Sequence, residues 1–402
     1  MIISDLAAAA CSLALIGASG PVALVSIAFI ASIVGHAGHP AFGAALPNLV
    51  GEAPSAGPRR SGHLSGGPRY GRMVLIRLGV RTSLALILLL SACTDDRSDA
   101  PSPAPTAGAV RWETLASLPT ARSEVAAATD GERVLVAGGF EGSGATIPTV
   151  EVLDLATVTW QSGPDLPLAV NHAMAAGLDG TIVVAGGYQG PGLGNPTDRV
   201  FALRDGAWEE LPPMPAPRAA GGAAVVEGRL YVAGGVGPDG RLAEETFVFD
   251  PSAGLWSVIE GQPTGREHLG VAGLDGELFV LGGRTVGIGS NVAAAEALDL
   301  AAGSWRSLPR MPTARGGSAA TATSNGYVVS AGGEADRAFD EAEVYDVRGG
   351  RWLSLPAMPT ARHGLGVVAV GTVVYAIAGG TEPGLSVSGA VEAIDLESLG
   401  TG

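Results

Sequence analysis

Residues 221–256 decide the fold, and they read GGAAVVEGRLYVAGGVGPDGRLAEETFVFDPSAGLW. Runs of small, β-branched and aromatic residues occupy positions 221–226, 229–235 and 246–250, and a shorter run ends at Trp256. The Gly, Pro and Asp residues between these runs favour tight turns. The stretch therefore predicts a unit of four short β-strands, which we call a, b, c and d.

Similar units recur along the chain. Each carries a Trp at spacings of 47 to 49 residues: Trp112, Trp160, Trp208, Trp256, Trp305 and Trp352. A Gly-Gly pair follows strand b in each unit: Gly138-Gly139, Gly186-Gly187, Gly234-Gly235, Gly282-Gly283, Gly332-Gly333 and Gly379-Gly380. An Asp stands six residues before the Trp in four units: Asp154, Asp250, Asp299 and Asp346. Ala202 breaks this series, and Asp395 extends it into the last unit.

These motif residues have structural uses. Glycine after strand b permits positive φ and close approach of backbones, and the Asp can accept bonds from amides of the c–d turn. The Trp fills space between neighbouring outer strands. We therefore expect none of the motif residues to be catalytic.

The Gly-Gly pair, the Asp six residues before a Trp and the period near 48 together resemble the Kelch repeat. The resemblance covers residues 110–402 and implies an all-β fold, a six-bladed Kelch-type β-propeller with four strands per blade. A single blade cannot bury both of its faces, whereas a closed ring of blades can. The Gly-His and Trp-Asp signatures of WD repeats do not recur, which excludes that kind of propeller.

The two ends of the repeat region predict how the ring closes. The last repeat ends with LESLGTG at 396–402 and supplies no Trp strand, whereas Trp112 stands before the first strand a with no partner strands of its own. We expect residues 110–114 to become the outermost strand of the last blade, which would remove two free sheet edges.

A second recurring pattern precedes strand a, as in MPTAR at 311–315. It places five arginines at one equivalent position: Arg122, Arg218, Arg266, Arg315 and Arg362. Val170 stands there in the second repeat. The Kelch resemblance places this position near the mouth of the central channel, where some family members contact an acidic peptide. We expect the arginines to bind an anionic ligand, because guanidinium groups pair bidentately with carboxylates. The alternative is that each Arg bonds loop carbonyls or the neighbouring blade.

Three histidines follow these positions closely, and we include them in the predicted ligand-binding site: His172, His268 and His363. Glu124 and Glu267 lie beside them in the sequence. We expect no bound metal, because the histidines belong to separate blades and their offsets from the Arg position are not all identical. We expect no cofactor either. The copper site of galactose oxidase needs a Cys, and no Cys follows Cys93.

The segment 73–93 resembles a bacterial lipoprotein signal peptide. Arg77 and Arg81 precede a short apolar run, and Leu-Ser-Ala-Cys at 90–93 resembles a lipobox. The resemblance implies that Cys93 is lipidated and becomes the mature N-terminus. Residues 94–109 are rich in Pro, Ala and Asp and are expected to be a disordered tether.

Residues 1–72 do not fit a protein that begins with this signal. Residues 6–50 contain no Asp, Glu, Lys or Arg and are apolar enough for one or two membrane segments. We interpret 1–72 as an apolar extension that results from a start codon placed too early, with Met73 as the true start. A membrane remnant is the alternative.

The chain has a formal net charge of −15, which disfavours binding to nucleic acid. We expect a cell-envelope lipoprotein, facing the periplasm or exterior, that binds a protein or carbohydrate ligand at the channel mouth and is not an enzyme. The alternative is a carbohydrate-active enzyme resembling the Kelch sialic acid mutarotase, with Glu124 or Glu267 as acid or base.

Overall fold

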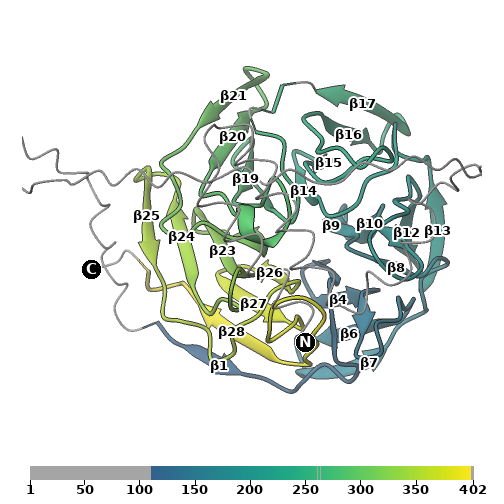
Figure 1. Cartoon of the computed structure of the whole chain (residues 1–402), viewed down its shortest axis with the longest axis horizontal. Coiled ribbons are helices and arrows are strands. Elements are labelled where there is room, and N and C mark those ends of the chain that lie inside the picture. Colours follow the sequence, from purple (N-terminus) through teal and green to yellow (C-terminus); the bar gives the residue numbers. More distant parts are fainter. Residues whose placement is uncertain (1–109, 260, 263, 400–402) are drawn as a thin grey trace, which may run out of the picture. The chain divides into compact units, whose positions relative to one another are not determined.

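The computed structural model describes residues 110–259, 261–262 and 264–399. The expectations for residues 1–72, the signal at 73–93, Cys93 and the tether at 94–109 lie outside the described residues. The described residues form six four-stranded antiparallel sheets, arranged as blades around a central axis (Figure 1). The prediction of an all-β, six-bladed propeller is therefore confirmed. Nowhere in these ranges is there a helix that is long and apolar enough to cross a membrane.

The first three blades follow one another along the chain, and each runs from strand a at the axis to strand d at the rim. Blade 1 comprises β3 (Ala126–Thr129), β4 (Arg133–Ala137), β6 (Val150–Asp154) and β7 (Thr159–Ser162). Blade 2 comprises β9 (Met174–Leu178), β10 (Thr181–Ala185), β12 (Val200–Arg204) and β13 (Ala207–Leu211). Blade 3 comprises β14 (Gly222–Val226), β15 (Arg229–Ala233), β16 (Thr246–Asp250) and β17 (Leu255–Ile259).

The other three blades complete the ring. Blade 4 comprises β18 (Gly270–Leu274), β19 (Glu277–Leu281), β20 (Ala295–Asp299) and β21 (Ser304–Ser307). Blade 5 comprises β22 (Gly316–Ala322), β23 (Tyr327–Glu334), β24 (Ala342–Asp346) and β25 (Arg351–Ser354). Blade 6 comprises β26 (Gly366–Val370), β27 (Val373–Ile377), β28 (Val391–Asp395) and β1 (Trp112–Thr114).

Short elements lie between the main strands. Two small antiparallel pairs join the start of strand a to the residues after strand b: β2 (Arg122–Ser123) with β5 (Phe140–Glu141), and β8 (Val170–Asn171) with β11 (Tyr188–Gln189). A 3-10 turn, η3 (Ile288–Ser290), lies in the loop between β19 and β20.

Blade 6 closes the ring at the rim. Strand β1 pairs antiparallel with β28, so that Trp112 stands opposite Ile394 and Thr114 opposite Glu392. Trp112 is 9% exposed, and its indole Nε1 donates to the carbonyl of Pro356 in the neighbouring blade at 2.8 Å. The predicted closure by the strand that carries Trp112 is therefore confirmed.

A second closure lies at the axis. Six residues, two positions after each Arg position, form a circle of backbone hydrogen bonds of 2.7 to 3.0 Å, which we call the axial ring. Each amide donates to the carbonyl of the equivalent residue in the adjacent blade, and every member has a positive φ between 52 and 73°. The members are Glu124, His172, Ala220, His268, Gly317 and Gly364.

The motif residues have the structural roles expected of them. Five of the six indole nitrogens donate to a backbone carbonyl next to the neighbouring blade, as Trp208 does to Pro164 at 2.8 Å, whereas Trp305 makes no such bond. Asp154 Oδ1 accepts from the amide of Thr157 at 2.8 Å in its c–d turn. The second Gly of a pair donates to the carbonyl at the Arg position of the next blade, as from Gly139 to Val170.

The last Gly-Gly pair is shifted by one residue from the position that the sequence indicated. In blade 6 it is Gly379 that donates to the carbonyl of Arg122, and Ala378 and Gly379 have φ of 60 and 99°. These angles match those of Gly138 and Gly139 in blade 1. Ala378 therefore occupies the first glycine position, and Gly380 is the residue that follows the pair.

Candidate functional site

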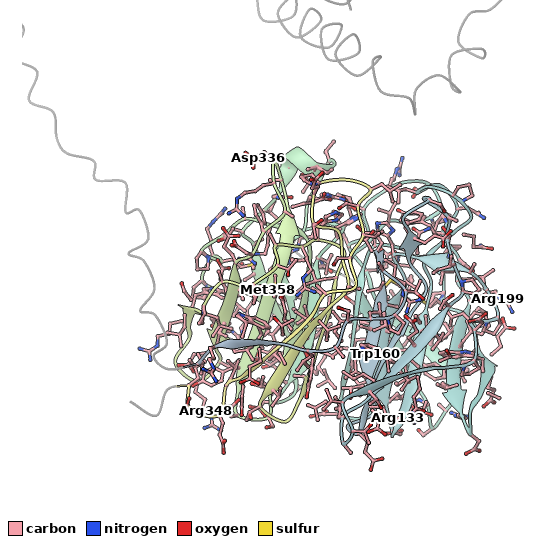
Figure 2. All side chains as sticks on the ribbon, turned by 90° about the horizontal axis from the view of Figure 1, so that it is seen from below. Arg133, Trp160, Arg199, Asp336, Arg348 and Met358 are labelled. Carbon is pink, nitrogen blue, oxygen red and sulfur yellow. The ribbon has the colours of Figure 1, made fainter. Side chains whose placement is uncertain are left out.

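The two faces of the propeller carry different connections. Asp336, from the b–c loop of blade 5, lies at one face, whereas Arg133 and Arg348 lie at the opposite one (Figure 2). Arg348 belongs to a c–d turn, and Arg133 begins strand b directly after an a–b turn. The long, dissimilar b–c loops therefore share one face, which we call the loop face.

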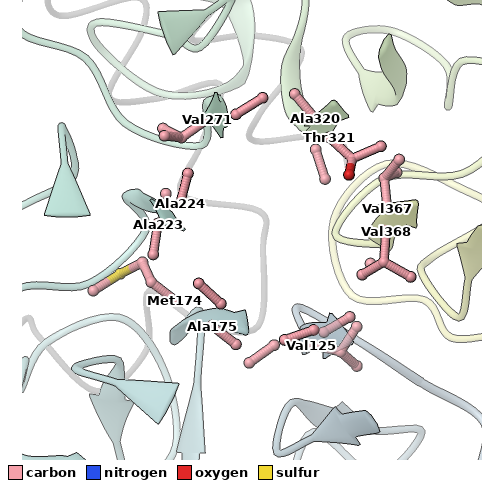
Figure 3. A pocket seen from close by; sticks show the side chains of 18 of the residues that line it. Val125, Met174, Ala175, Ala223, Ala224, Val271, Ala320, Thr321, Val367 and Val368 are labelled. Carbon is pink, nitrogen blue, oxygen red and sulfur yellow. The ribbon is translucent and has the colours of Figure 1, made fainter. Parts of the chain in front are cut away.

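A channel of about 340 Å³ runs along the axis between the six inner strands. Small apolar side chains line it, such as Ala175, Ala223 and Val367, and they face one another across the opening (Figure 3). The inner strands need small residues because the blades approach closely there: a Cβ on Gly177 would lie 2.1 Å from the carbonyl oxygen of Thr129. Three polar members of the axial ring also line the channel: Glu124, His172 and His268.

Around these three residues lies a group of buried ionisable side chains, which we call the axial cluster. Its members are Glu124, His172, Glu267, His268, Arg284, Glu334 and His363. Six of them are less than 10% exposed as whole residues, and the most exposed side chains of the cluster are those of Glu124 at 12% and Glu267 at 11%. Groups from five of the six blades therefore meet at one end of the channel.

Contacts around Glu124 connect three blades. Its Oε2 lies 3.1 Å from His172 Nε2, and its Oε1 lies 3.3 Å from His363 Nδ1. The imidazoles of His172 and His268 meet edge to face, with 4.7 Å between their centroids. The sequence-based expectation that separate blades keep these histidines apart is therefore wrong. His172 and His268 share the ring position of Glu124, and that position is close enough to the axis for the side chains to converge.

A chain of ion pairs continues on the other side of the cluster. His268 Nδ1 contacts the Glu267 carboxylate, and Arg284 Nε donates to that carboxylate at 2.7 Å. Arg284 Nη1 donates to Glu334 Oε1 at 2.9 Å. Glu334 Oε2 accepts from the amide of Gly384, which brings the b–c loop of blade 6 to the cluster.

Burial and charge shift the titration of this cluster. Burial lowers the pKa of His172, and burial together with the neighbouring His172 lowers the pKa of His268 well below its usual value. Burial opposes ionisation of Glu124, but the charge of His172 and the hydrogen bond from His363 outweigh it and lower the pKa of that carboxyl. Burial also opposes the charge on His363, but the contact with Glu124 outweighs it and raises the pKa of His363.

The five arginines lie elsewhere. They are at most 1% exposed, none of them lines the channel, and each is paired with a glutamate at strand c: Glu151, Glu245, Glu296, Glu343 and Glu392. Arg362 also donates to the carbonyl of Ala390 at 2.7 Å. This geometry corresponds in part to the structural alternative: the arginines bond backbone carbonyls, as that alternative expected, but their carboxylate partners lie in their own blade and not in the neighbouring one. A contact between these arginines and a ligand stays a prediction.

Blade 2 shows why the pairing is structural. Val170 replaces the Arg there, and Phe201 stands at the strand position that Glu151 occupies in blade 1. In blade 3, Arg218 stacks over Phe247 at 4.4 Å and takes Glu245 as its carboxylate. The missing Arg and the missing Glu of the second repeat were visible in the sequence, and this joint loss could have predicted the pairs.

Sequence reasoning missed Arg284, Glu334 and Asn171. Arg284 and Glu334 directly follow their Gly-Gly pairs, and backbone bridges place that position opposite the residue that follows the Arg position. Asn171 Oδ1 lies 2.6 Å from His172 Nδ1. All three stand at fixed positions relative to the repeat motifs: directly after a Gly-Gly pair or directly after the Arg position. These positions lie near the axis, so the spacing could have identified the three residues.

Six blades around an axial channel, with a polar cluster at one end, define a six-bladed β-propeller. Residues 172–380 match the family model described as the KLHDC2/KLHL20/DRC7 Kelch-repeats domain, and residues 121–167 match the Kelch motif. The chain belongs to the Kelch-repeat family. Its propeller is, in general terms, a scaffold for protein binding. A search of curated proteins found no match to the chain.

Proposed function

We propose that this protein is a non-enzymatic binding protein, anchored at the cell envelope through a lipid on Cys93, that docks a protein partner on its loop face. The observation that carries the proposal is the placement of exposed apolar side chains. Among the described residues, seven large apolar side chains are exposed, and four of them lie on b–c loops: Leu193, Val286, Ile288 and Leu385. Val286 is 84% exposed. Exposed apolar groups gathered on one face are typical of a protein interaction surface.

The four side chains come from the loops of blades 2, 4 and 6, which alternate around the channel mouth. The loops themselves differ in length and sequence, as a specificity surface on a repeated scaffold would. A partner that covers the mouth could contact all three loops at once. Apolar contacts near the centre of an interface supply most of its binding energy.

The sugar-acid alternative and the preference for an anionic ligand both depend on available guanidinium groups. Arg284 is the guanidinium of the axial cluster, and Glu267 and Glu334 already bind it. The five repeat arginines are paired inside the blades. The proposal therefore commits to a protein partner recognised through apolar contacts.

The test compares two triple variants of the full chain in a crosslinking pull-down from the native cell envelope. The first variant combines Leu193→Ser, Val286→Ser and Leu385→Ser, and it should no longer capture the partner. The matched control, Val158→Ser, Leu255→Ser and Val258→Ser, changes side chains that are 44 to 67% exposed and lie away from the b–c loops. The control should retain the partner. Retention by both variants would contradict docking on the loop face, and loss from both would indicate unspecific adsorption.

A further inference from the structure

We propose that Glu124, His172 and His268 form a binding site for a divalent transition-metal ion at the propeller axis. The three residues come from blades 1, 2 and 4, and one ligand atom of each lies within 4.8 Å of the others. Two imidazoles and one carboxylate are a donor set that suits Zn²⁺ and its first-row neighbours. This inference departs from the expectation, based on sequence, that no metal binds.

The hydrogen bonds around Asn171 fix which nitrogen of His172 carries a proton. Asn171 Nδ2 donates to Thr146 Oγ1 at 2.8 Å, and the Thr146 hydroxyl donates to the carbonyl of Gly190. The amide oxygen of Asn171 therefore faces His172 Nδ1, at 2.6 Å. Because that oxygen only accepts, Nδ1 must be the protonated nitrogen.

This tautomer leaves the lone pair of His172 Nε2 pointing at another acceptor. Glu124 Oε2 lies 3.1 Å away, so two lone-pair atoms face each other unless a proton or a metal ion lies between them. Two ligands held tetrahedrally at about 2 Å from a zinc ion are separated by roughly 3.3 Å. A metal ion fits this spacing and does so without placing a charge on a buried imidazole.

His268 and Glu124 have the supporting contacts that metal ligands usually have. His268 Nδ1 is engaged by the Glu267 carboxylate, which Arg284 holds in turn, so Nε2 remains as the free donor atom. A carboxylate behind an imidazole orients the ring and raises its basicity toward a metal. His363 holds Glu124 Oε1 and leaves Oε2 available.

The charges of the cluster favour a cation as well. The carboxylates of Glu267 and Glu334 bind the guanidinium of Arg284, and Glu124 adds a third carboxylate to the cluster. Three carboxylates and one guanidinium give the described cluster an excess of acidic groups. The site opens to the channel, and three protein ligands leave a coordination position free for water or for a group that enters the channel.

The test is titration of the full chain, freed of metal with a chelator, with Zn²⁺ alone and then with Co²⁺ alone. We expect one tight equivalent of Zn²⁺ and, with Co²⁺, visible absorption bands of a site with nitrogen ligands and low coordination number. Glu124→Gln and His268→Gln should each weaken Zn²⁺ binding by about 100-fold or more, because a lost ligand costs more than a lost supporting contact. Circular dichroism must show that each variant is folded.

The matched control replaces His36, His39 and His63 with Gln, which removes the other histidines that precede the propeller. It should retain the tight equivalent. If a ligand variant fails to fold, the Co²⁺ spectrum of the unsubstituted chain decides. Absence of a stoichiometric ion, or loss of the tight equivalent only in the control, would overturn the proposal.

Discussion

The backbone amide of Glu124 donates to the carbonyl oxygen of Gly364 at 2.7 Å, although the two residues belong to the first and the last blade. This bond completes the axial ring. At the rim, β1 pairs with β28 and closes the same two blades. The chain ends are thus fastened at both the inner and the outer radius, and the axial ring sets where the side chains of the candidate metal site begin.

Closure at the rim predicts a sharp truncation boundary. A chain that begins at residue 116 lacks β1 and the buried indole of Trp112, and we expect it to lose about 3–5 kcal/mol of unfolding free energy, the usual cost of removing a buried Trp. Urea denaturation measures this. A chain that begins at residue 109 retains β1 and serves as the control. Equal midpoints for the two chains would mean that β1 adds nothing to closure.

The buried ion pairs predict a compensating double substitution. Arg315→Val leaves Glu343 buried without its partner, and we expect a loss of about 3–5 kcal/mol. Adding Glu343→Phe reproduces the Val170 and Phe201 combination of blade 2 and should restore most of the loss. Thermal and chemical denaturation of both variants provide the measurement. A double variant no more stable than the single one would count against a structural pair.

Two glycines of the axial ring predict different costs for the same substitution. A Cβ on Gly364 would lie 2.4 Å from Glu124 Oε1 and 2.9 Å from its amide nitrogen, whereas one on Gly317 would meet nothing closer than 3.3 Å. Their φ values are 55 and 73°, and Ala220 occupies the same ring position at 54°. Gly364→Ala should therefore cost about 1–3 kcal/mol, and Gly317→Ala only the backbone strain of about 1 kcal/mol. The difference between the denaturation midpoints of the two variants measures the cost of the steric clash with Glu124. Equal midpoints would contradict such a clash.

The lipobox predicts selective lipidation. Expressed from Met73, the protein should incorporate a palmitate analogue and sediment with membranes, and Cys93→Ala should abolish both. Cys11→Ala, tested in the full chain, is the matched control, since the sequence holds only these two cysteines. Label that persists in Cys93→Ala would refute lipidation at this residue.

The sequence by itself determined the propeller, its number of blades and its closure. Each of these follows from local patterns that repeat: a strand pattern, a Gly-Gly pair and a Trp at a spacing of 47 to 49 residues, with the strand of Trp112 left over at one end. Such a pattern can be recognised from residues close together in the sequence. Each blade can bury its two faces only against neighbouring blades, so the repeats must close into a ring.

The tertiary structure alone decided which side chains reach the axis. The sequence placed Arg122 and Glu124 two positions apart, but β-geometry sends Arg122 into its blade toward Glu151, while the positive φ of Glu124 brings it to the axial ring. His172 and His268 are far apart in the chain, yet their ring centroids are only 4.7 Å apart. Equivalent positions of the blades converge near the axis because the blades are related by rotation. Radius and side-chain direction arise only when the blades pack around a common axis, and they determine which residues are structural and which can bind.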